Sequence, residues 1–274
     1  MLQPCKLNSR RRILLAAGLF FLVNMLWDFV GTDNGKSLQA APVGESLKIP
    51  VGTVLPVSLE HPLSSKDLKK GEAIEGRVMQ DVLLPNKEKI PANSKLLGSI
   101  AEVVSPENGP ASITFRFTSL EIRHSTTVPV VVALRAMASF EATQAAQTPY
   151  QDSPSGSPAT WETTLQIGGD VRYGDGGKVT NHHHRKIGKA TTGGGVLVPL
   201  EDSPGSPCAG WPGATQGPQA LWLFSADACG LYDLKHIRLA HAGNKEPLGD
   251  ITLMKDQGEI KIMKSSALLL RVVR

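Results

Sequence analysis

Three consecutive histidines in the stretch "NHHHR" are the residues with the plainest capacity for chemistry. His182, His183 and His184 carry imidazoles, which bind transition metals. Neighbouring side chains of a strand point to opposite faces, so only His182 and His184 could share a metal site there. No cysteine or carboxylate lies at a partnering interval. We expect an exposed polar turn, with a metal site at His182 and His184 as the alternative, and no resident cofactor.

Two cysteines form the second candidate pair. Cys208 and Cys229 are the only cysteines beyond the N-terminal segment, which contains Cys5. In an oxidising compartment such a pair forms a disulfide. A nucleophile or a metal-binding pair is the alternative, but the separation lacks the C-x-x-C clustering of zinc sites. The sequence therefore predicts a Cys208–Cys229 disulfide.

Glycine-rich stretches resemble ligand loops but do not match them. "GTDNGKS" (31–37) is one residue short of a phosphate-binding loop, and no strand precedes it. "GGDVRYGDGG" (168–177) offers Asp170 and Asp175, without the full ligand spacing of a calcium loop. Hairpin turns explain the second stretch, because Gly and Asp favour turns.

Motifs of known catalytic sites are missing from the sequence. It contains no G-x-S-x-G elbow, H-E-x-x-H helix or dinucleotide fingerprint. A Ser-His-Asp triad depends on geometry, so an envelope hydrolase stays an alternative. We expect His236 and His241 at the surface, and Trp222, within "LWLF", in the core. We name no catalytic residue.

The N-terminal segment has the pattern of an export signal. Arg10, Arg11 and Arg12 precede an apolar run from Ile13 to Trp27, and "SRRRILL" resembles a twin-arginine motif. Residues 13–31 are either a cleaved signal or an uncleaved anchor to the inner membrane, since the run is short for a span and Asp28 ends it. Both alternatives place the rest of the chain outside the cytoplasm, in the periplasm. We therefore assign residues 1–40 to a signal peptide or membrane anchor.

The distribution of charge argues against nucleic-acid binding. The net charge is +4, but five of the 29 basic and two of the 25 acidic residues lie in the first forty positions, so 24 and 23 remain. A nucleic-acid-binding protein concentrates Lys and Arg in its folded part. We expect no nucleic-acid partner.

Period-two patterning predicts antiparallel strands through most of the remaining chain. In "SITFRFTSLEI", Ile113, Phe115 and Phe117 share one face, and polar residues occupy the other. Similar alternation runs through "VLPVSL", "AIEGRVMQDVLL" and "VPVVVALR". These are the marks of a half-buried antiparallel sheet.

Two short repeats supply the turns that begin strands. "IPVGT" (49–53) and "IPANS" (90–94) each precede a strand-like run. Pro50 and Pro91 suit the second position of a type I turn, and Gly52 and Asn93 suit the fourth. We predict that each repeat launches a strand.

The order of these motifs resembles a known family. The series "IPVGTVLPVSL", "GEAIEGRVMQDVLLPNKEKIPANSKLLGSIAEV" and "ITFRFTSLEI", closing on "VPV", is similar to the β-barrel domain of the TrbI family over about residues 48–132. TrbI proteins are the envelope-spanning components of type IV secretion and conjugation machines. The resemblance implies a barrel and a role in an envelope assembly.

The whole sequence predicts a mainly β protein, with an antiparallel barrel or sandwich unit at 48–138. A Pro/Ser-rich loop or linker follows at 141–160, and a disulfide-stapled β region at 161–274 could share one core with the first unit. In its Gly/Pro-rich middle we expect glycine turns. In its C-terminal antiparallel sheet we expect strands at "LWLF", "HIRLAHA", "DITLM", "EIKIM" and "ALLLRVV", with a hairpin turn at Asp256–Gly258.

The predicted function is a non-catalytic binding or assembly module of the cell envelope. Abundant turn-and-strand patterning without a catalytic motif favours this role. The expected partners are other envelope proteins or a second copy, with self-association through edge strands. The N-terminal segment would contact the membrane if it is not cleaved. An envelope hydrolase acting on cell wall or polysaccharide and a metal-binding periplasmic protein are the alternatives.

Overall fold

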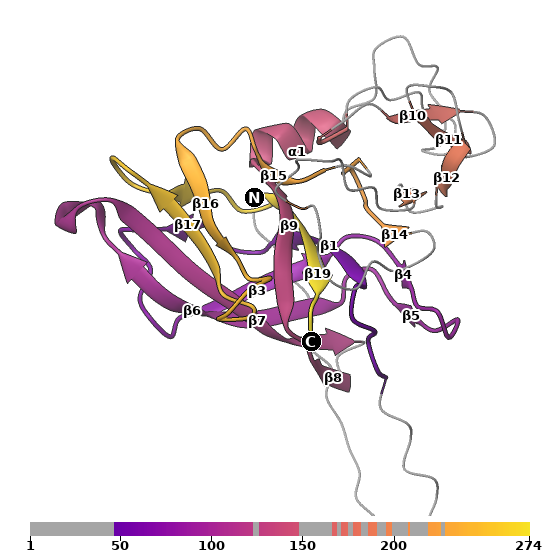
Figure 1. Ribbon diagram of the computed structural model, residues 1–274, viewed down its shortest axis with the longest axis horizontal. Coiled ribbons are helices and arrows are strands. Elements are labelled where there is room, and N and C mark those ends of the chain that lie inside the picture. The colour runs from indigo at the N-terminus through magenta and orange to yellow at the C-terminus, as the bar shows by residue number, and fades with distance from the viewer. Residues whose placement is uncertain are drawn as a thin grey trace, which may run out of the picture. The chain divides into compact units, whose positions relative to one another are not determined.

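The predicted strands assemble into one large sheet that curves into a nearly closed barrel (Figure 1). The structure is a computed structural model that describes residues 47–122, 126–147, 166–168, 171–174, 178–181, 186–190, 196–198, 208, 219–225 and 228–274. The mainly β, antiparallel fold predicted from the sequence is confirmed. His182, His184, Asp170, Asp175 and Arg10–Arg12 lie outside the described residues.

The barrel sheet interleaves strands from the beginning and the end of the chain. Its order is β15-β9-β19-β1-β3-β6-β7-β17-β16, and β8 also pairs with β7. All neighbours are antiparallel except β15 and β9, which run parallel. The bounds are β1 Val54–Leu59, β3 Ala73–Val78, β6 Lys95–Val104, β7 Ala111–Ile122, β8 Thr126–Pro129, β9 Val132–Ala138, β15 Gly230–Tyr232, β16 Ile237–Ala242, β17 Ile251–Lys255 and β19 Ala267–Val272.

Shorter elements complete the described chain. A five-stranded sheet runs in the order β10-β11-β12-β13-β14, and two small sheets pair β18 with β2 and β4 with β5. The strand bounds are β2 Leu63–Ser64, β4 Val82–Leu83, β5 Lys89–Ile90, β10 Val171–Gly174, β11 Lys178–Asn181, β12 Lys186–Ala190, β13 Val196–Val198, β14 Gln219–Ala220 and β18 Lys261–Ile262. The helical elements are the 3-10 turn η1, Pro106–Asn108, and the helix α1, Phe140–Gln147. Within the described residues, no helix has the length and apolar content needed to cross a membrane.

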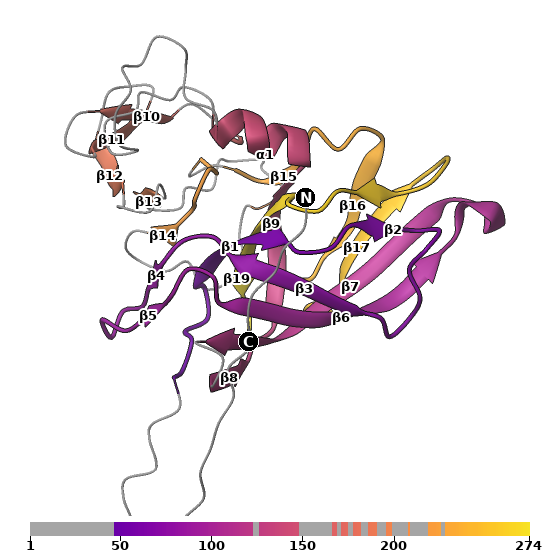
Figure 2. The ribbon, with the colours of Figure 1, turned by 180° about the vertical axis from the view of Figure 1, so that it is seen from behind.

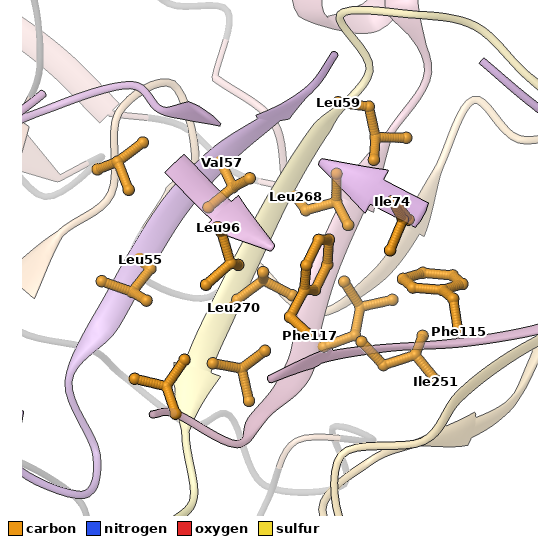
Figure 3. Packing of buried hydrophobic residues seen from close by; sticks show 14 of the residues in the cluster. Leu55, Val57, Leu59, Ile74, Leu96, Phe115, Phe117, Ile251, Leu268 and Leu270 are labelled. Carbon is orange, nitrogen blue, oxygen red and sulfur yellow. The ribbon is translucent and has the colours of Figure 1, made fainter. Parts of the chain in front are cut away.

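The barrel interior is filled by apolar side chains (Figure 3). Phe115 and Phe117 meet edge to face, with ring centroids 6.0 Å apart, an arrangement that aromatic pairs favour. They are fully buried among side chains from strands on all sides, which include Leu55, Ile74, Leu96, Ile251 and Leu270. A filled interior makes this barrel a packed core and not a channel. The predicted inward face of "SITFRFTSLEI" is confirmed.

The outer face of β1, β19 and β9 is buried too, which the expectation of a half-buried sheet did not foresee. Every residue of these three strands is buried. Val54, Ala136 and Leu269 belong to a second apolar cluster, outside the barrel, which Leu221 and Phe224 cover. These strands therefore have no polar face, unlike β7, whose Arg116 and Thr118 are exposed. A strand buried on both faces reads as a continuous apolar run, as "ALLLRVV" does.

The helix α1 adds to this outer cover, although its residues overlap a segment for which we predict a loop. Ser139 caps its N-terminus: the Ser139 hydroxyl accepts a hydrogen bond from Ala142 N at 3.0 Å and donates one to Asp233 Oδ2 at 2.8 Å. Serine is a favoured N-cap, and "FEATQAAQ" consists mainly of good helix formers. On the buried side, Thr143 Oγ1 accepts a hydrogen bond from Ala267 N of β19 at 3.3 Å.

The two Pro-containing repeats form matching turns, and each launches a strand as predicted. The turns start one residue later than predicted: Thr53 N donates to Pro50 O at 3.1 Å, and Ser94 N donates to Pro91 O at 3.3 Å. The prolines are therefore at the first position. Gly52 and Asn93 are at the third, with φ of 89° and 69°. A positive φ at that position marks a type II turn, for which Gly and Asn are suited, so the predicted type I assignment is wrong.

Two predictions for the C-terminal region are also wrong. "LWLF" (221–224) forms no strand: Phe224 N donates to Leu221 O and closes a turn, and Trp222 has a φ of 54°. Its apolar character reflects burial in the outer cluster, where Trp222 is only partly buried. Asp256–Gly258 is not a hairpin turn, because β18 pairs with β2 while β17 pairs with β16 and β7. Two hydrogen bonds beside this pair connect β18 to β2: Ser65 N donates to Ile260 O, and Ile260 N donates to Ser65 Oγ.

Candidate functional site

Among the described strands, the ladder of the barrel sheet is interrupted between β9 and β16. Along its other edge β9 pairs with β19 throughout, from Val132 to Ala138. On the edge of β9 that faces β16, only the last residues, Ala136–Ala138, have a partner strand, which is β15. β16 pairs with β17 alone among the described strands. The views of Figures 1 and 2 place β16 beside β15 and β9. We call this unladdered border of the barrel the seam.

A tight turn closes one end of the seam. Gly243 and Gly249, at the two ends of the β16–β17 connection, bond through Gly249 N and Gly243 O at 2.9 Å. Both have positive φ, and they pack against Val131 and Val132 at the start of β9. A Cβ at position 249 would lie 2.7 Å from Val131 Cγ1. Glycine is needed here because the connection packs closely against the start of β9, across the seam.

A disulfide lies at the other end of the seam and confirms the predicted Cys208–Cys229 pair. The two Cα atoms are 6.0 Å apart, within the usual range. Cys229 directly precedes β15, and Cys208 Sγ lies 3.5 Å from Arg135 O of β9. Ala133, Ala242 and the two cysteines form a small apolar cluster between β9 and β16. The disulfide therefore fixes a segment from outside the sheet onto the seam.

Between the glycine turn and the disulfide lies a cavity of about 230 Å³, which we call the seam pocket. Leu134 and Leu239 form its apolar walls, together with the disulfide. Its polar lining comes from Arg135 of β9, His241 of β16, and the turn residues Asn244 and Lys245. The pocket is smaller than the cavities of about 300–1,000 Å³ that hold drug-sized ligands. It therefore suits a group the size of an amino-acid side chain.

Arg135 is buried at the pocket wall, with an exposed fraction of 1%. The pairing of β9 with β19 shifts at this position: Leu134 pairs with Leu270 and Ala136 with Leu269, so Arg135 is an extra residue in β9. A bulge of this kind re-aims a side chain. The irregularity in the ladder thus puts a charged residue at the seam, within a strand whose other side chains are all apolar.

We expect His241 at the surface from the sequence, and it lies beside the pocket, where it fixes the turn. It is half-buried. Its Nδ1 lies 2.6 Å from Asp250 O and 3.0 Å from Gly243 N, and its Nε2 lies 3.2 Å from Glu246 O. One imidazole therefore joins β16 to both arms of the connection. His236 is exposed, as expected.

The acidic residues next to the pocket are engaged elsewhere. Asp250 forms a two-point ion pair with Arg116 of β7: Oδ1 is 2.8 Å from Nε and Oδ2 is 3.0 Å from the terminal nitrogen. Glu246 is exposed on the turn, where its carboxylate accepts a hydrogen bond from Leu248 N. Neither carboxylate lines the seam pocket. The polar lining in the described part of the chain is therefore basic or neutral.

Other charged pairs lie on the outside of the barrel. Arg77 donates two hydrogen bonds to Glu60, from Nε at 3.0 Å and from a terminal nitrogen at 3.3 Å. These bonds lower the pKa of Glu60 and raise that of Arg77. Bonding from Lys89 likewise lowers the pKa of Asp81. Within the described ranges, no three His, Cys, Asp or Glu side chains converge on a point where a metal ion could bind.

The residues of the seam pocket were missed by motif reading because they come from four separate stretches of chain. Of them, only the cysteines were predicted as a pair. Arg135 carried a signal, since a charged residue inside the apolar run "VVVALRAMA" must be explained by a partner or a function. His241, Asn244 and Lys245 carried none, because a polar connection between strands is ordinary.

No protein-family model matches the sequence. No curated protein matches it either. The function is therefore inferred from the geometry of the barrel and its seam.

Proposed function

We propose that this protein is a non-catalytic binding module of the bacterial cell envelope, and that its binding site is the seam. The main support for this proposal is the filled barrel interior. A packed core has no internal binding site, so a ligand or partner would bind on the outside of the barrel. The seam supports it as the one described border of the sheet where two strand edges face each other without pairing. Unpaired edges are sites at which β proteins bind partners.

The chemistry around the seam pocket favours binding over catalysis. A hydrolytic triad needs a nucleophile and an acid that orients the base. In the described lining, His241 has no Ser or Asp side chain beside it, and its ring nitrogens face backbone groups. We therefore rank an envelope hydrolase as a less favoured function than a binding module.

A location outside the cytoplasm is part of the same proposal. A disulfide persists in oxidising compartments and is rare in the cytosol, and Cys208 and Cys229 form one beside the seam. The export pattern of Arg10–Arg12 and residues 13–31 supports the periplasm, with either a cleaved signal or an inner-membrane anchor. The resemblance of residues 48–132 to the TrbI barrel supports a role beside secretion-machine components.

Site-specific photo-crosslinking in cells would test the proposal. A benzophenone amino acid at Ala240, exposed on β16, is compared with one at Leu83, exposed on the small β4–β5 sheet. We expect a discrete adduct in the periplasmic or membrane fraction from position 240 and none from position 83. An adduct of twice the chain mass would show self-association, and a heavier or lighter one an envelope partner. Equal labelling at both positions, or a cytoplasmic chain with reduced cysteines, would contradict the proposal.

A further inference from the structure

We propose that His241 is a proton-controlled switch in the seam: gain of a proton at its Nδ1 exchanges its hydrogen-bond partner and loosens the rim of the seam pocket. This inference rests on the proposed binding function and names how that function is regulated. It comes from three backbone groups around one imidazole ring, which cannot all be satisfied at the same time.

The conflict lies at Nδ1 of His241. This nitrogen is 2.6 Å from Asp250 O, a carbonyl oxygen that accepts a hydrogen bond, and 3.0 Å from Gly243 N, whose N–H donates one. A ring nitrogen is a donor when it carries hydrogen and an acceptor when it does not. Nδ1 therefore bonds either Asp250 O or Gly243 N, and its proton decides which.

The second ring nitrogen makes this choice depend on the charge of the ring. Nε2 lies 3.2 Å from Glu246 O, and a bond to a carbonyl oxygen requires hydrogen on Nε2. The neutral ring then has no hydrogen left for Nδ1, which accepts from Gly243 N. The other neutral tautomer would satisfy Asp250 O alone, so it is disfavoured.

A proton added at Nδ1 gives the imidazolium form of His241. This form donates to Asp250 O and keeps its bond to Glu246 O, whereas Gly243 N–H loses its acceptor on the ring. Histidine is the side-chain type that changes its charge between pH 5 and 8. We therefore expect the exchange of partners in that range.

The charged groups around the ring are engaged with other partners or lie on the pocket lining. Arg116 of β7 binds the Asp250 carboxylate, and the Glu246 carboxylate accepts from Leu248 N. Carboxylates, lysine and arginine as side-chain types keep their charge between pH 5 and 8. A pH response in this range therefore reports the imidazole. The remaining charged groups are Lys245 of the connection and Arg135 of β9, on the pocket lining, and Arg238 of β16, which is bound by Asp256.

The exchange acts on the seam pocket through the connection after β16. Gly243 begins the segment that carries Asn244 and Lys245, both of which line the pocket. The neutral ring bonds this segment at Gly243 and at Glu246, and the cationic ring bonds it only at Glu246. A rim that must become ordered during binding lowers affinity. Acid therefore weakens binding at the seam.

NMR of the oxidised, full chain between pH 5 and pH 8 tests the switch. We expect the Gly243 amide and the Asp250 carbonyl carbon to shift together with the ring nitrogens of His241. Nδ1 should change from acceptor to donor as the pH falls. Deuterium exchange of the Gly243 amide, corrected for the intrinsic rate at each pH, should be about two- to tenfold faster at pH 5 than at pH 8, as expected for the loss of one hydrogen bond.

Two histidine variants locate the effect. His241→Gln keeps a donor and an acceptor at this position but gains no proton in this range, so its Gly243 amide should exchange equally, after the same correction, at both pH values. His236→Gln removes an exposed histidine just before β16 and should respond like the natural chain. If His241→Gln fails to fold, the ring nitrogen signals of the natural chain still decide the question.

A Gly243 amide that does not respond to pH, or one that responds equally in His241→Gln, would overturn the switch. Crosslinking from position 240, repeated in cells at pH 5 and pH 8, tests its link to binding. We expect a lower adduct yield at pH 5 in the natural chain and equal yields in His241→Gln. Equal yields in the natural chain would overturn the regulation but keep the binding module. No adduct at either pH, with the Gly243 response intact, would overturn the binding module but keep the exchange of partners.

Discussion

The barrel closes in two different ways at two of its borders. At the junction of β1 and β19, five residue pairs from Val54–Arg271 to Ser58–Ala267 form a continuous antiparallel ladder, and both faces are buried. At the seam, β9 and β16 lie side by side without a ladder. The glycine turn after β16 packs against Val131 and Val132, and the disulfide packs with Ala133 and Ala242 of the two strands. A ladder leaves no room for a ligand, whereas closure through side chains leaves a pocket.

Substitutions at the two borders are therefore expected to change different properties of the protein. Junction residues lie between two apolar cores, so their substitution should act on folding. Seam residues line the pocket, so their substitution should change the pocket as well as the stability.

The largest effect is expected at the junction. Leu270→Ala in β19 removes a fully buried side chain from the barrel interior, and a cavity of this kind costs about 2–5 kcal/mol. Met263→Ala, at a half-exposed site, should change the free energy of unfolding by less than about 0.5 kcal/mol. Urea denaturation measures both. A cost for Leu270→Ala as small as that of Met263→Ala would contradict the account of the core.

The next largest effect is expected at the disulfide. The Cys208→Ala, Cys229→Ala double variant opens a loop of 21 residues' separation, and we expect a loss of about 3 kcal/mol through the chain entropy of the unfolded state. Unfolding with and without reductant measures the loss in the natural chain. Reductant should have no further effect on the double variant. If the natural chain and the double variant have the same free energy of unfolding, with and without reductant, the disulfide does not stabilise the seam.

The glycine turn of the seam can be compared with an unconstrained glycine. Gly249→Ala and Gly258→Ala both place a methyl group at positive φ, 84° and 77°, which costs about 1–2 kcal/mol. Only at position 249 does the new Cβ meet a neighbour, Val131 Cγ1. We expect Gly249→Ala to cost roughly 1–3 kcal/mol more, as overpacking does. Equal midpoints in thermal unfolding would contradict the contact across the seam.

A smaller effect is expected at the two matching turns. Thr53→Ala removes a hydroxyl bond to Pro50 O of 2.7 Å at the junction, and Ser94→Ala removes the equivalent bond to Pro91 O, also 2.7 Å, inside the sheet. Each should cost about 0.5–1.5 kcal/mol. Equal costs in urea denaturation would show that the junction is as regular as an interior ladder. A much larger cost for Thr53→Ala would show that the junction depends on its turn.

The smallest effect is a pH dependence near the junction. Arg77 lowers the pKa of Glu60, so this pair stabilises the fold above the unfolded pKa of about 4.3. The contribution is lost as the pH falls through the lower, folded pKa. We expect less than about 1 kcal/mol, because the pair is partly exposed. A double-mutant cycle with Glu60→Gln and Arg77→Gln should give a coupling at pH 7 that is larger than the coupling at pH 3.

The inward faces of the strands could be predicted from the sequence because alternation of apolar and polar residues is a local property. Ile113, Phe115 and Phe117 point inward as their spacing predicts. The turns at Pro50 and Pro91 were located for the same reason, although their type depends on a backbone φ that the residue types permit but do not fix.

The strand partners and the site could not be predicted. β18 pairs with β2 and not with β17, because pairing over long separations is decided by the whole fold. "LWLF" is apolar because it covers the outer face of β1, β19 and β9, and a buried turn has the same composition as a buried strand. The seam pocket combines Arg135, His241 and Cys208, and only the folded topology brings these residues together.

The pairing of β1 with β19 also sets the order in which the molecule can be built. Leu55 and Leu270 pair directly, and synthesis on the ribosome makes β1 first and β19 last among the described strands. At about 5–20 residues per second, the roughly 215 residues between them take on the order of 10–40 s to make. During that interval one edge of β1 has no strand beside it, and its apolar side chains are open to chaperones and to other nascent chains. The barrel therefore matures only after elongation has passed position 272, and shortened chains that stop earlier should be cleared by proteases.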